Sequence, residues 1–285
     1  MTKYKFAIIA DTSQDFTFEL ADKYGIKLVP YTTQMGDKHY KDLIELSKED
    51  FYRTIDNYDT IGTSTPAIQT VVDAIKELIE EGYEEVLAVT SSRNMTGMAN
   101  LYLSIDQMNL GIKIKIFDGE QIGSAGALLT LEACKLRDQG LSIDETYKRL
   151  VELRPNATIS ALFRNLKYLV AGSRINKTKA AIGGILKISP ILIMKDTRVG
   201  MVEKVRGDKK SLKRLVELIK ERIGDSKDYD LVLYHGDDRE EFDQMKEMLE
   251  DEVKAATLYL ETVVTPVLGV HTGPKTIGYA ILNRD

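Results

Sequence analysis

The sequence is poor in the residues that most often carry catalysis or bind metals. Its 285 residues include one cysteine, three histidines and no tryptophan. A single cysteine permits neither a disulfide within the chain nor a cluster of thiolate ligands, and Cys134 lies among helix-forming apolar residues that favour a buried structural thiol. No carboxylate stands at metal-ligand spacing from His39, His235 or His271. We therefore expect no metal site.

An excess of positive charge and a long N-terminal apolar run are also missing. The formal net charge is −5 and the isoelectric point is near 5.5, whereas nucleic-acid-binding proteins usually carry a basic field over their binding face. The first apolar run, residues 6–10, ends at Asp11 and is too short for a signal-peptide core or a membrane span. The sequence predicts a cytoplasmic protein that does not bind nucleic acid.

Phosphate-binding and nucleophile motifs are absent as well. No G-x-x-x-x-G-K-[ST] loop occurs, and no G-x-G-x-x-G follows the first apolar run. The G-S-A-G stretch at residues 123–126 has a glycine directly before Ser124, so it fails the G-x-S-x-G spacing of a nucleophile elbow. Because nucleotide binding loses its usual support, we expect no cofactor.

What the first half does contain is a series of short apolar, β-branched runs that end in Asp, Ser or Gly. They cover residues 5–11, 84–92 and 112–119, and each is followed by a longer segment of helical period. This order is typical of a parallel sheet covered by helices. The sequence therefore predicts an α/β fold for the N-terminal part.

The second half differs, because residues 188–207 contain two apolar runs joined by K-D-T-R-V-G. That pattern predicts a hairpin, and therefore a mixed sheet. An amphipathic helix over residues 141–154 precedes this half. The length of the chain allows two domains, which we place at residues 1–154, an N-terminal α/β domain, and 155–285, a C-terminal α/β domain with a mixed sheet.

Helix starts and one long loop can be predicted in the N-terminal part. Ser47 stands three residues before Asp50, which is the spacing of a capping pair. A strongly amphipathic segment has Pro66 in its predicted first turn and Gly82 at its end. Residues 32–46 show neither the helical nor the strand period of apolar residues, so we expect the longest unstructured segment there.

Hydroxyl-bearing residues recur where the predicted strands end. In open parallel sheets, ligands bind outside the carboxyl ends of the strands. Serine and threonine are also good helix caps, which is the plainer interpretation of each group alone. Their recurrence at one edge favours a neutral, donor-rich rim suited to a carboxylate or a phosphate. The groups are Asp11 to Ser13, Gly62 to Thr65, Thr90 to Ser92, and Asp118 with Gly119.

His271 is the histidine that the sequence marks most clearly. It lies in G-V-H-T-G-P-K-T-I-G, where glycines and Pro274 indicate a loop of fixed shape and Thr272 can form a local hydrogen bond. We expect His271 to orient a hydroxyl group or to meet an anion. His235, at a predicted strand end, suits a structural role, and His39 suits an exposed turn.

A local basic cluster stands out in this acidic chain. Arg174, Lys177 and Lys179 precede the paired glycines at 183 and 184, and Arg206 precedes a basic helix. Two interpretations fit these charges equally well. They belong either to a solvated helix start or to a positively charged entrance of an apolar binding cavity. A local basic patch often meets an acidic partner or a phosphate.

Taken together, these segments resemble the DegV family. The stretches A-D-T-S-Q-D, G-T-S-T-P-A-I-Q, T-S-S-R-N-M-T-G-M-A-N, A-G-S-R-I-N-K and V-L-G-V-H-T-G-P-K-T-I-G occur in the order, and at about the spacings, of that family. The resemblance extends over almost the whole chain. It implies a bacterial fatty-acid-binding protein without enzymatic activity of its own, the lipid-presenting subunit of a two-component fatty acid kinase.

The resemblance also implies the ligand, the partner and the site. A long-chain fatty acid lies between the two domains, and a separate ATP-binding kinase subunit phosphorylates its carboxylate to give an acyl phosphate for phospholipid synthesis. Separately from the resemblance, we expect that the protein can contact a membrane surface transiently. The implied ligand-binding residues are Thr63, Ser64, Ser91, Ser92, His271 and Thr272, and the implied residues for docking of the kinase are Arg174 and Arg206.

At three positions the sequence departs from the usual pattern of the family. Thr65 stands where glutamine is common, Arg93 where glycine is usual, and Lys275 again where glycine is common. The two added positive charges bear on the preference for a head group and on docking of the kinase.

Two other functions fit parts of the pattern. A hydrolase of acyl or ester groups would use Ser92 or Ser124 with His271 and Asp11. A binder of a small phosphorylated metabolite would share the hydroxyl rim but not an apolar slot. Burial of about fifteen methylenes at roughly 0.8 kcal/mol each would supply about 12 kcal/mol before the cost of association, which suffices for a lipid-binding protein.

Overall fold

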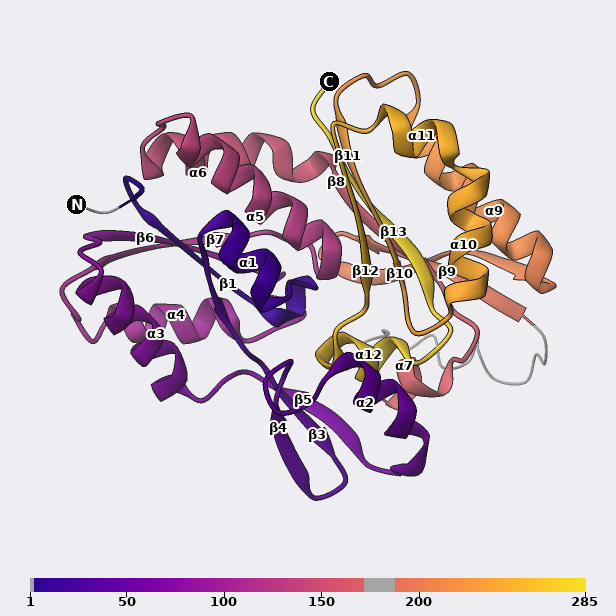
Figure 1. Ribbon diagram of the computed structural model, residues 1–285, viewed down its shortest axis with the longest axis horizontal. Helices are drawn as coiled ribbons and strands as arrows, with labels where there is room; N and C mark the ends of the chain where they lie inside the picture. The colour runs from indigo at the N-terminus through magenta and orange to yellow at the C-terminus, as the bar shows by residue number, and fades with distance from the viewer. Residues whose placement is uncertain (1–2, 172–187) are drawn as a thin grey trace.

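The N-terminal part of the chain forms a parallel sheet with helices on both faces. The structure is a computed structural model that describes residues 3–171 and 188–285 (Figure 1). The sheet has the order β2-β1-β6-β7, and every neighbouring pair is parallel. Its strands are β1 (Ala7–Asp11), β2 (Ile26–Val29), β6 (Glu85–Thr90) and β7 (Lys113–Asp118). β1 is buried along its whole length, as expected for a continuous apolar strand covered on both faces.

Helices cover both faces of this sheet. In Figure 1, α3 and α4 lie on one face and α5 and α6 on the other. Ser47 caps the following helix by accepting a hydrogen bond from the backbone N–H of Asp50, as predicted. Pro66, by contrast, lies before its helix rather than in the first turn. The helices are α1 (Phe18–Tyr24), α2 (Lys48–Thr54), α3 (Ile68–Glu80), α4 (Met98–Asp106), α5 (Gly123–Asp138) and α6 (Ile143–Leu153), with short 3-10 turns η1 (Thr12–Gln14), η2 (Ile55–Asn57) and η3 (Arg154–Asn156).

The segment expected to be unstructured forms a small antiparallel sheet instead. β3 (Thr32–Met35) pairs with β4 (Lys38–Lys41) on one side and with β5 (Ile61–Ser64) on the other. A two-residue turn joins β3 and β4, and Gly36 begins it with φ 62°, a conformation that glycine adopts without steric cost. The exposed His39 therefore lies on a strand and not in a turn.

The C-terminal part forms the mixed sheet that the sequence predicts. Its order is β10-β9-β8-β13-β11-β12, and only β11 and β12 are parallel. The predicted hairpin is β9 and β10, closed by Asp196 and Thr197, which both have positive φ as this turn type requires. The strands are β8 (Ala157–Leu162), β9 (Ile188–Lys195), β10 (Arg198–Arg206), β11 (Tyr229–His235), β12 (Leu258–Val263) and β13 (Ile277–Asn283); the helices are α7 (Lys167–Ala171), α9 (Asp208–Ile223), α10 (Arg239–Met248), α11 (Glu250–Ala255) and α12 (Pro266–Thr272).

Helix α5 packs against both sheets. It contacts β1 and β6 of the parallel sheet, and β8 and β13 of the mixed sheet. Nearly all of its residues are buried, as expected for a helix that is covered all round. Cys134 lies in this helix, and burial raises the pKa of its thiol to about 12, so the predicted structural thiol is confirmed. The domain boundary between residues 154 and 155 remains a proposal. In the structure, β8 is the first strand along the chain that belongs to the mixed sheet.

Across the described ranges 3–171 and 188–285, none of the helices is both long enough and apolar enough to cross a membrane.

Candidate binding site between the two sheets

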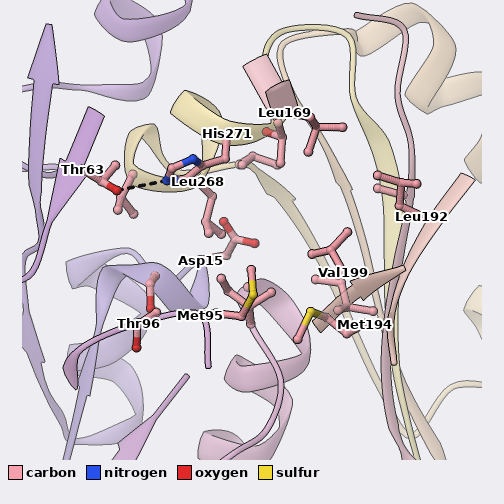
Figure 2. Close-up of a pocket in the computed structure, with 18 of the residues that line it drawn as sticks. Asp15, Thr63, Met95, Thr96, Leu169, Leu192, Met194, Val199, Leu268 and His271 are labelled. Carbon is pink, nitrogen blue, oxygen red and sulfur yellow. Dashed lines mark hydrogen bonds between the residues drawn. The ribbon is translucent and has the colours of Figure 1, made fainter. Parts of the chain in front are cut away.

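A cavity of about 300 Å³ lies between the parallel-sheet part and the mixed-sheet part (Figure 2). This volume is at the lower end of the range of about 300–1,000 Å³ that is usual for small-molecule sites. Both parts of the chain contribute apolar side chains to its wall, so the cavity depends on how the two parts are joined. The apolar wall includes Met95, Ile122, Phe163, Leu169, Leu192 and Val199.

One polar end of the cavity is formed by Thr63 and His271. Thr63 Oγ1 and His271 Nε2 are 3.0 Å apart, which is hydrogen-bond distance. Thr63 comes from β5 of the small sheet, and His271 comes from α12 in the C-terminal part. Figure 2 shows this pair well separated from Leu192 and Val199, which lie on the mixed-sheet side. The structure therefore brings together two residues, 208 positions apart in the sequence, that the resemblance implied.

His271 lies in the last turn of helix α12 and not in a loop, which corrects the prediction. The helix begins at Pro266, whose fixed φ suits a first helical position, and ends before Gly273. Gly273 has φ 73°, and a Cβ atom there would lie 2.1 Å from the ring of Tyr168. The glycine and proline pattern therefore marks the end of a short helix that presents the imidazole.

Further hydroxyl-bearing residues line the cavity, among them Ser64, Thr65, Thr96 and Thr272. The hydroxyl oxygens of Thr96 and Thr272 are buried and have no hydrogen-bond partner among the described residues. Buried polar groups are nearly always paired, so these two oxygens are suited to the polar atoms of a ligand. Thr96 was missed by the sequence reasoning, although it belongs to the T-G pair in one of the segments that resemble the family.

Ser91 and Ser92 do not line this cavity. Both are buried at the end of β6, and Ser91 Oγ lies 2.8 Å from Ser13 Oγ, which does belong to the wall. Ser92 donates its backbone N–H to Gln121 at 2.7 Å and its hydroxyl to the Thr197 carbonyl at 3.3 Å. The structure thus places Ser92 in a contact between the end of β6 and the β9–β10 turn.

The serines of the hydrolase alternative form hydrogen bonds with groups other than His271. The Ser92 hydroxyl donates to Thr197, and the Ser124 hydroxyl donates to Asp15 Oδ2 at 2.9 Å. Asp11 accepts hydrogen bonds from Ser13, and burial raises its pKa to about 6. The described residues therefore do not assemble the serine–histidine contact that this chemistry needs.

Asp15 is a buried carboxylate in the cavity wall that the sequence reasoning missed. It follows η1 with φ 61°, a conformation that aspartate adopts more readily than most residues. Its Oδ1 accepts the backbone N–H of Thr265 at 3.1 Å, and its Oδ2 accepts the Ser124 hydroxyl. Burial raises the pKa of Asp15, opposed by the charge of Lys48 and by these donors. Asp15 therefore ties the parallel-sheet part to the segment that leads into α12.

His235 has the structural role that was expected for it. It ends β11, it is buried, and its Nδ1 accepts the backbone N–H of Asp238 at 3.1 Å. Its ring packs 4.8 Å from that of Phe242, and burial lowers its pKa, which favours the neutral imidazole.

The basic residues that the sequence marked lie in different surroundings. Arg93 pairs with Asp118 at 2.7 Å, so its charge is already neutralised, and Lys275 is exposed at φ 62° after the Pro274 turn. Arg206 is exposed at the end of β10, beside the exposed Lys209 and Lys210 at the start of α9. Arg174 lies outside the described residues.

Comparisons with known proteins bear on the fold and the family. Residues 5–284 match the family described as "Uncharacterised protein, DegV family". The chain is similar to a DegV domain-containing protein of Clostridium acetobutylicum, with 32% identity over 281 residues that cover 98% of this chain and 99% of the relative.

Two solved structures have the same fold. A DegV family protein of Thermus thermophilus, described by its fatty acid binding, has a TM-score of 0.90 and 20% identity, covering 98% of this chain and 100% of that chain. DegV of Bacillus subtilis, described as a fatty acid binding protein, has a TM-score of 0.89 and 24% identity, covering 99% and 100%. At these identities the likeness shows the fold of this chain and not its ligand.

Proposed function

We propose that this chain, which belongs to the DegV family, binds a long-chain fatty acid in the cavity between its two sheets. The observation that carries the proposal is an apolar cavity with Thr63 and His271 at one polar end. Family members from Thermus thermophilus and Bacillus subtilis that are described as fatty acid binding share its fold. The acyl chain would lie against the apolar wall, and the carboxylate would lie at the Thr63–His271 pair.

Burial of the acyl chain is the main favourable term for binding a lipid in this cavity. A chain of about fifteen methylenes contributes about 12 kcal/mol on burial, and association costs about 4–15 kcal/mol in lost freedom. The carboxylate loses its hydration on entering the cavity, so it needs donors in place of water. The threonine hydroxyls and the imidazole of His271 can supply them without an opposite full charge. A head group held by neutral donors keeps an oxygen available for reaction.

The finer part of the proposal is that the bound carboxylate is presented to a separate ATP-dependent kinase subunit. A carboxylate oxygen would attack the γ-phosphorus of ATP, ADP would leave, and an acyl phosphate for phospholipid synthesis would result. This chain would hold and expose the substrate without catalysing the transfer, in the cytoplasm where ATP is available. The exposed Arg206 with its neighbouring lysines supports a docking role toward an acidic surface of the kinase.

Native mass spectrometry of the protein as purified tests lipid binding and the head-group residues together. We expect the wild-type protein to carry a fatty acid that leaves only on denaturation. Thr63→Val and His271→Ala each remove a donor from the head group, and a hydrogen bond to a charged group contributes about 1.5–3 kcal/mol, so each should weaken affinity about 10-fold or more. His39→Ala, which removes an exposed histidine on β4, should bind like wild type.

Two results would contradict the proposal. Wild-type protein that carries no lipid and takes up no added palmitate, yet binds inorganic phosphate saturably, would favour the phosphorylated-metabolite alternative. Unchanged lipid occupancy in both Thr63→Val and His271→Ala would move the head group away from this end of the cavity.

Docking to the kinase makes a separate prediction. Arg206→Ala should slow formation of acyl phosphate by the kinase subunit about 3- to 10-fold at low salt, because charges at the rim of an interface act mainly on the rate of association. Retention of the fatty acid should not change, because Arg206 does not line the cavity. Lys148→Ala, an exposed lysine on α6, is the matched control. Equal loss of lipid and of acyl phosphate in Arg206→Ala would show that the docking role is wrong.

A further inference from the structure

Asp42 is a fully buried carboxylate at the junction of the small sheet and helix α12, which carry Thr63 and His271. It follows β4, and its backbone N–H donates to the carbonyl of Tyr31 at 2.9 Å. Its Oδ1 accepts the backbone N–H of Val267 at 3.1 Å and the hydroxyl of Thr33 at 3.3 Å. One side chain therefore connects the small sheet and helix α12.

The two main partners of Asp42 lead directly to Thr63 and His271. Thr33 on β3 is the register partner of Thr63 on β5, so the strand that Asp42 holds lies beside the strand that carries Thr63. Val267 is in the first turn of α12, four residues before His271 in the same helix. Figure 1 shows α12 next to this small sheet, and α12 contacts both β3 and β5. Asp42 thus fixes the two supports from which Thr63 and His271 project.

Neither ligand contact nor pairing with a neighbouring base explains a carboxylate at this position. Asp42 does not line the cavity, so it does not touch the proposed head group. Its Oδ2 is buried and has no hydrogen-bond partner among the residues that the structure describes. Lys48 contributes charge nearby, but its ammonium group donates to the Val263 carbonyl and the Thr262 hydroxyl. Burial of such a group is unfavourable, and what it provides in return is the geometry of its Oδ1 hydrogen bonds.

We propose that Asp42 is a positioning residue that holds Thr63 and His271 at their hydrogen-bond distance, and that this arrangement is what receives a fatty acid carboxylate. The claim that this pair receives a carboxylate rests on the proposed function, because the pair matters for binding only if it holds the head group. The claim that Asp42 positions the pair concerns the ligand-free protein. Asp42→Ala should separate the small sheet from α12, disturb the environment of His271 and weaken binding of the fatty acid.

The positioning of His271 by Asp42 can be measured directly in the ligand-free protein. With three histidines in the sequence, the imidazole signals of ¹³C-labelled histidine can be assigned by single substitutions at His39 and His235. In delipidated protein, Asp42→Ala should shift the His271 signals toward those of an exposed histidine and leave the His39 signals unchanged. Palmitate affinity should fall about 10-fold or more, which corresponds to about 1.4 kcal/mol.

Two variants separate positioning from general loosening. Asp42→Asn keeps a side-chain carbonyl oxygen that can accept from Val267 and Thr33, so it should restore the His271 signals and bring affinity within about 3-fold of wild type. Tyr52→Phe removes the hydroxyl that donates to Val264 at 3.2 Å, a contact to the same segment that does not involve the small sheet, and should match wild type in both readouts. Should Asp42→Ala not fold, Thr33→Val removes only the hydroxyl bond and should give the same changes at smaller size.

The outcomes distinguish the two proposals. Unchanged His271 signals in Asp42→Ala, or equal changes in Tyr52→Phe, would overturn the positioning role. Shifted His271 signals in a protein whose wild-type form binds no palmitate would support the positioning of the pair and reject the proposed ligand.

Discussion

Val199→Trp is expected to lower the affinity for a C16 fatty acid at least about 100-fold. Val199 lines the apolar side of the cavity from the edge strand β10, away from Thr63 and His271. The indole would occupy space that the end of the acyl chain needs. If four methylenes can no longer be buried, the loss is about 3 kcal/mol at roughly 0.8 kcal/mol each, which corresponds to about 100-fold in affinity.

The same variant should prefer shorter acids. A C10 or C12 acid keeps its carboxylate at the same donors and does not reach the indole, so its affinity should fall by less than about 3-fold. Because the sequence has no tryptophan, the new residue is the only one, and its fluorescence reports on the cavity directly. Its emission should be that of a buried indole and should change when C10 acid is added.

Val202→Trp is the matched control for this variant. Val202 lies on the same strand, is 39% exposed and does not line the cavity. It should bind C16 and C10 acids like wild type and show the emission of an exposed indole. The Val199→Trp variant could instead bind C16 acid with the affinity of wild type while its indole is buried. That result would show that the acyl chain does not occupy this part of the cavity.

The elements that the sequence predicts well are those whose signals are local. Three parallel strands of the N-terminal sheet follow from continuous apolar runs, and the β9–β10 hairpin follows from two runs around a K-D-T-R turn. The Ser47 cap depends on residues within one turn of a helix. Such patterns need no knowledge of distant contacts, because period and capping act over a few residues.

The elements that the sequence missed depend on contacts between distant segments. β3 alternates buried Thr33 and Met35 with half-buried polar residues, but its partner β5 lies about thirty residues further along the chain. His271 belongs to a helix of seven residues, too short for a periodic signal. The burial of Ser92 against Thr197 is a contact across the two parts of the chain, which no local pattern contains.

The same reason explains which site residues were found. His271 was marked by the glycines and proline around it and Thr63 by a hydroxyl-rich strand end, but only the resemblance treated the two together; the structure places them 3.0 Å apart. Asp15 and Asp42 are each ordinary as local residues, one after a 3-10 turn and one after a short strand. Their roles come from backbone N–H groups of Thr265 and Val267, more than 200 residues away. Buried carboxylates of this kind are recognisable only when the partner segment is in place.

Arg284→Met is expected to lower the free energy of unfolding by about 3–5 kcal/mol above neutral pH. The Arg284 side chain is 9% exposed and lies between the carboxylates of Glu132 and Asp230, which are 4% and 3% exposed. Its Nε donates to Glu132 at 3.0 Å and its Nη1 to Asp230 at 3.0 Å. Removal of one partner from a buried ion cluster leaves uncompensated buried charge, which is what makes the loss large.

This loss should depend on pH with a definite sign. Burial raises the pKa of Asp230, and Arg284 opposes that shift, so the variant should have a higher Asp230 pKa still. A carboxyl whose folded pKa lies above its unfolded value binds more protons in the folded state between the two values, so stability falls as pH rises through that interval. The deficit of Arg284→Met relative to wild type should therefore be largest above the raised pKa and should shrink as the pH is lowered toward the ordinary carboxyl range.

Urea unfolding followed by circular dichroism at a series of pH values measures both effects. Neutralisation of the partners, Glu132→Gln with Asp230→Asn in the Arg284→Met background, should recover most of the lost stability, because no buried charge then remains without a partner. Arg149→Met, which breaks an exposed pair with Glu152 on α6, should cost less than about 1 kcal/mol.

A deficit below about 1 kcal/mol at pH 8, or one that does not change with pH, would contradict this account. Glu132 lies on α5 and Asp230 on β11 of the mixed sheet, so the cluster spans the two parts of the chain whose junction encloses the cavity. A variant that loosens this junction should also release a bound fatty acid faster at high pH than at low pH. The partner-neutralised variant should hold the acid at both.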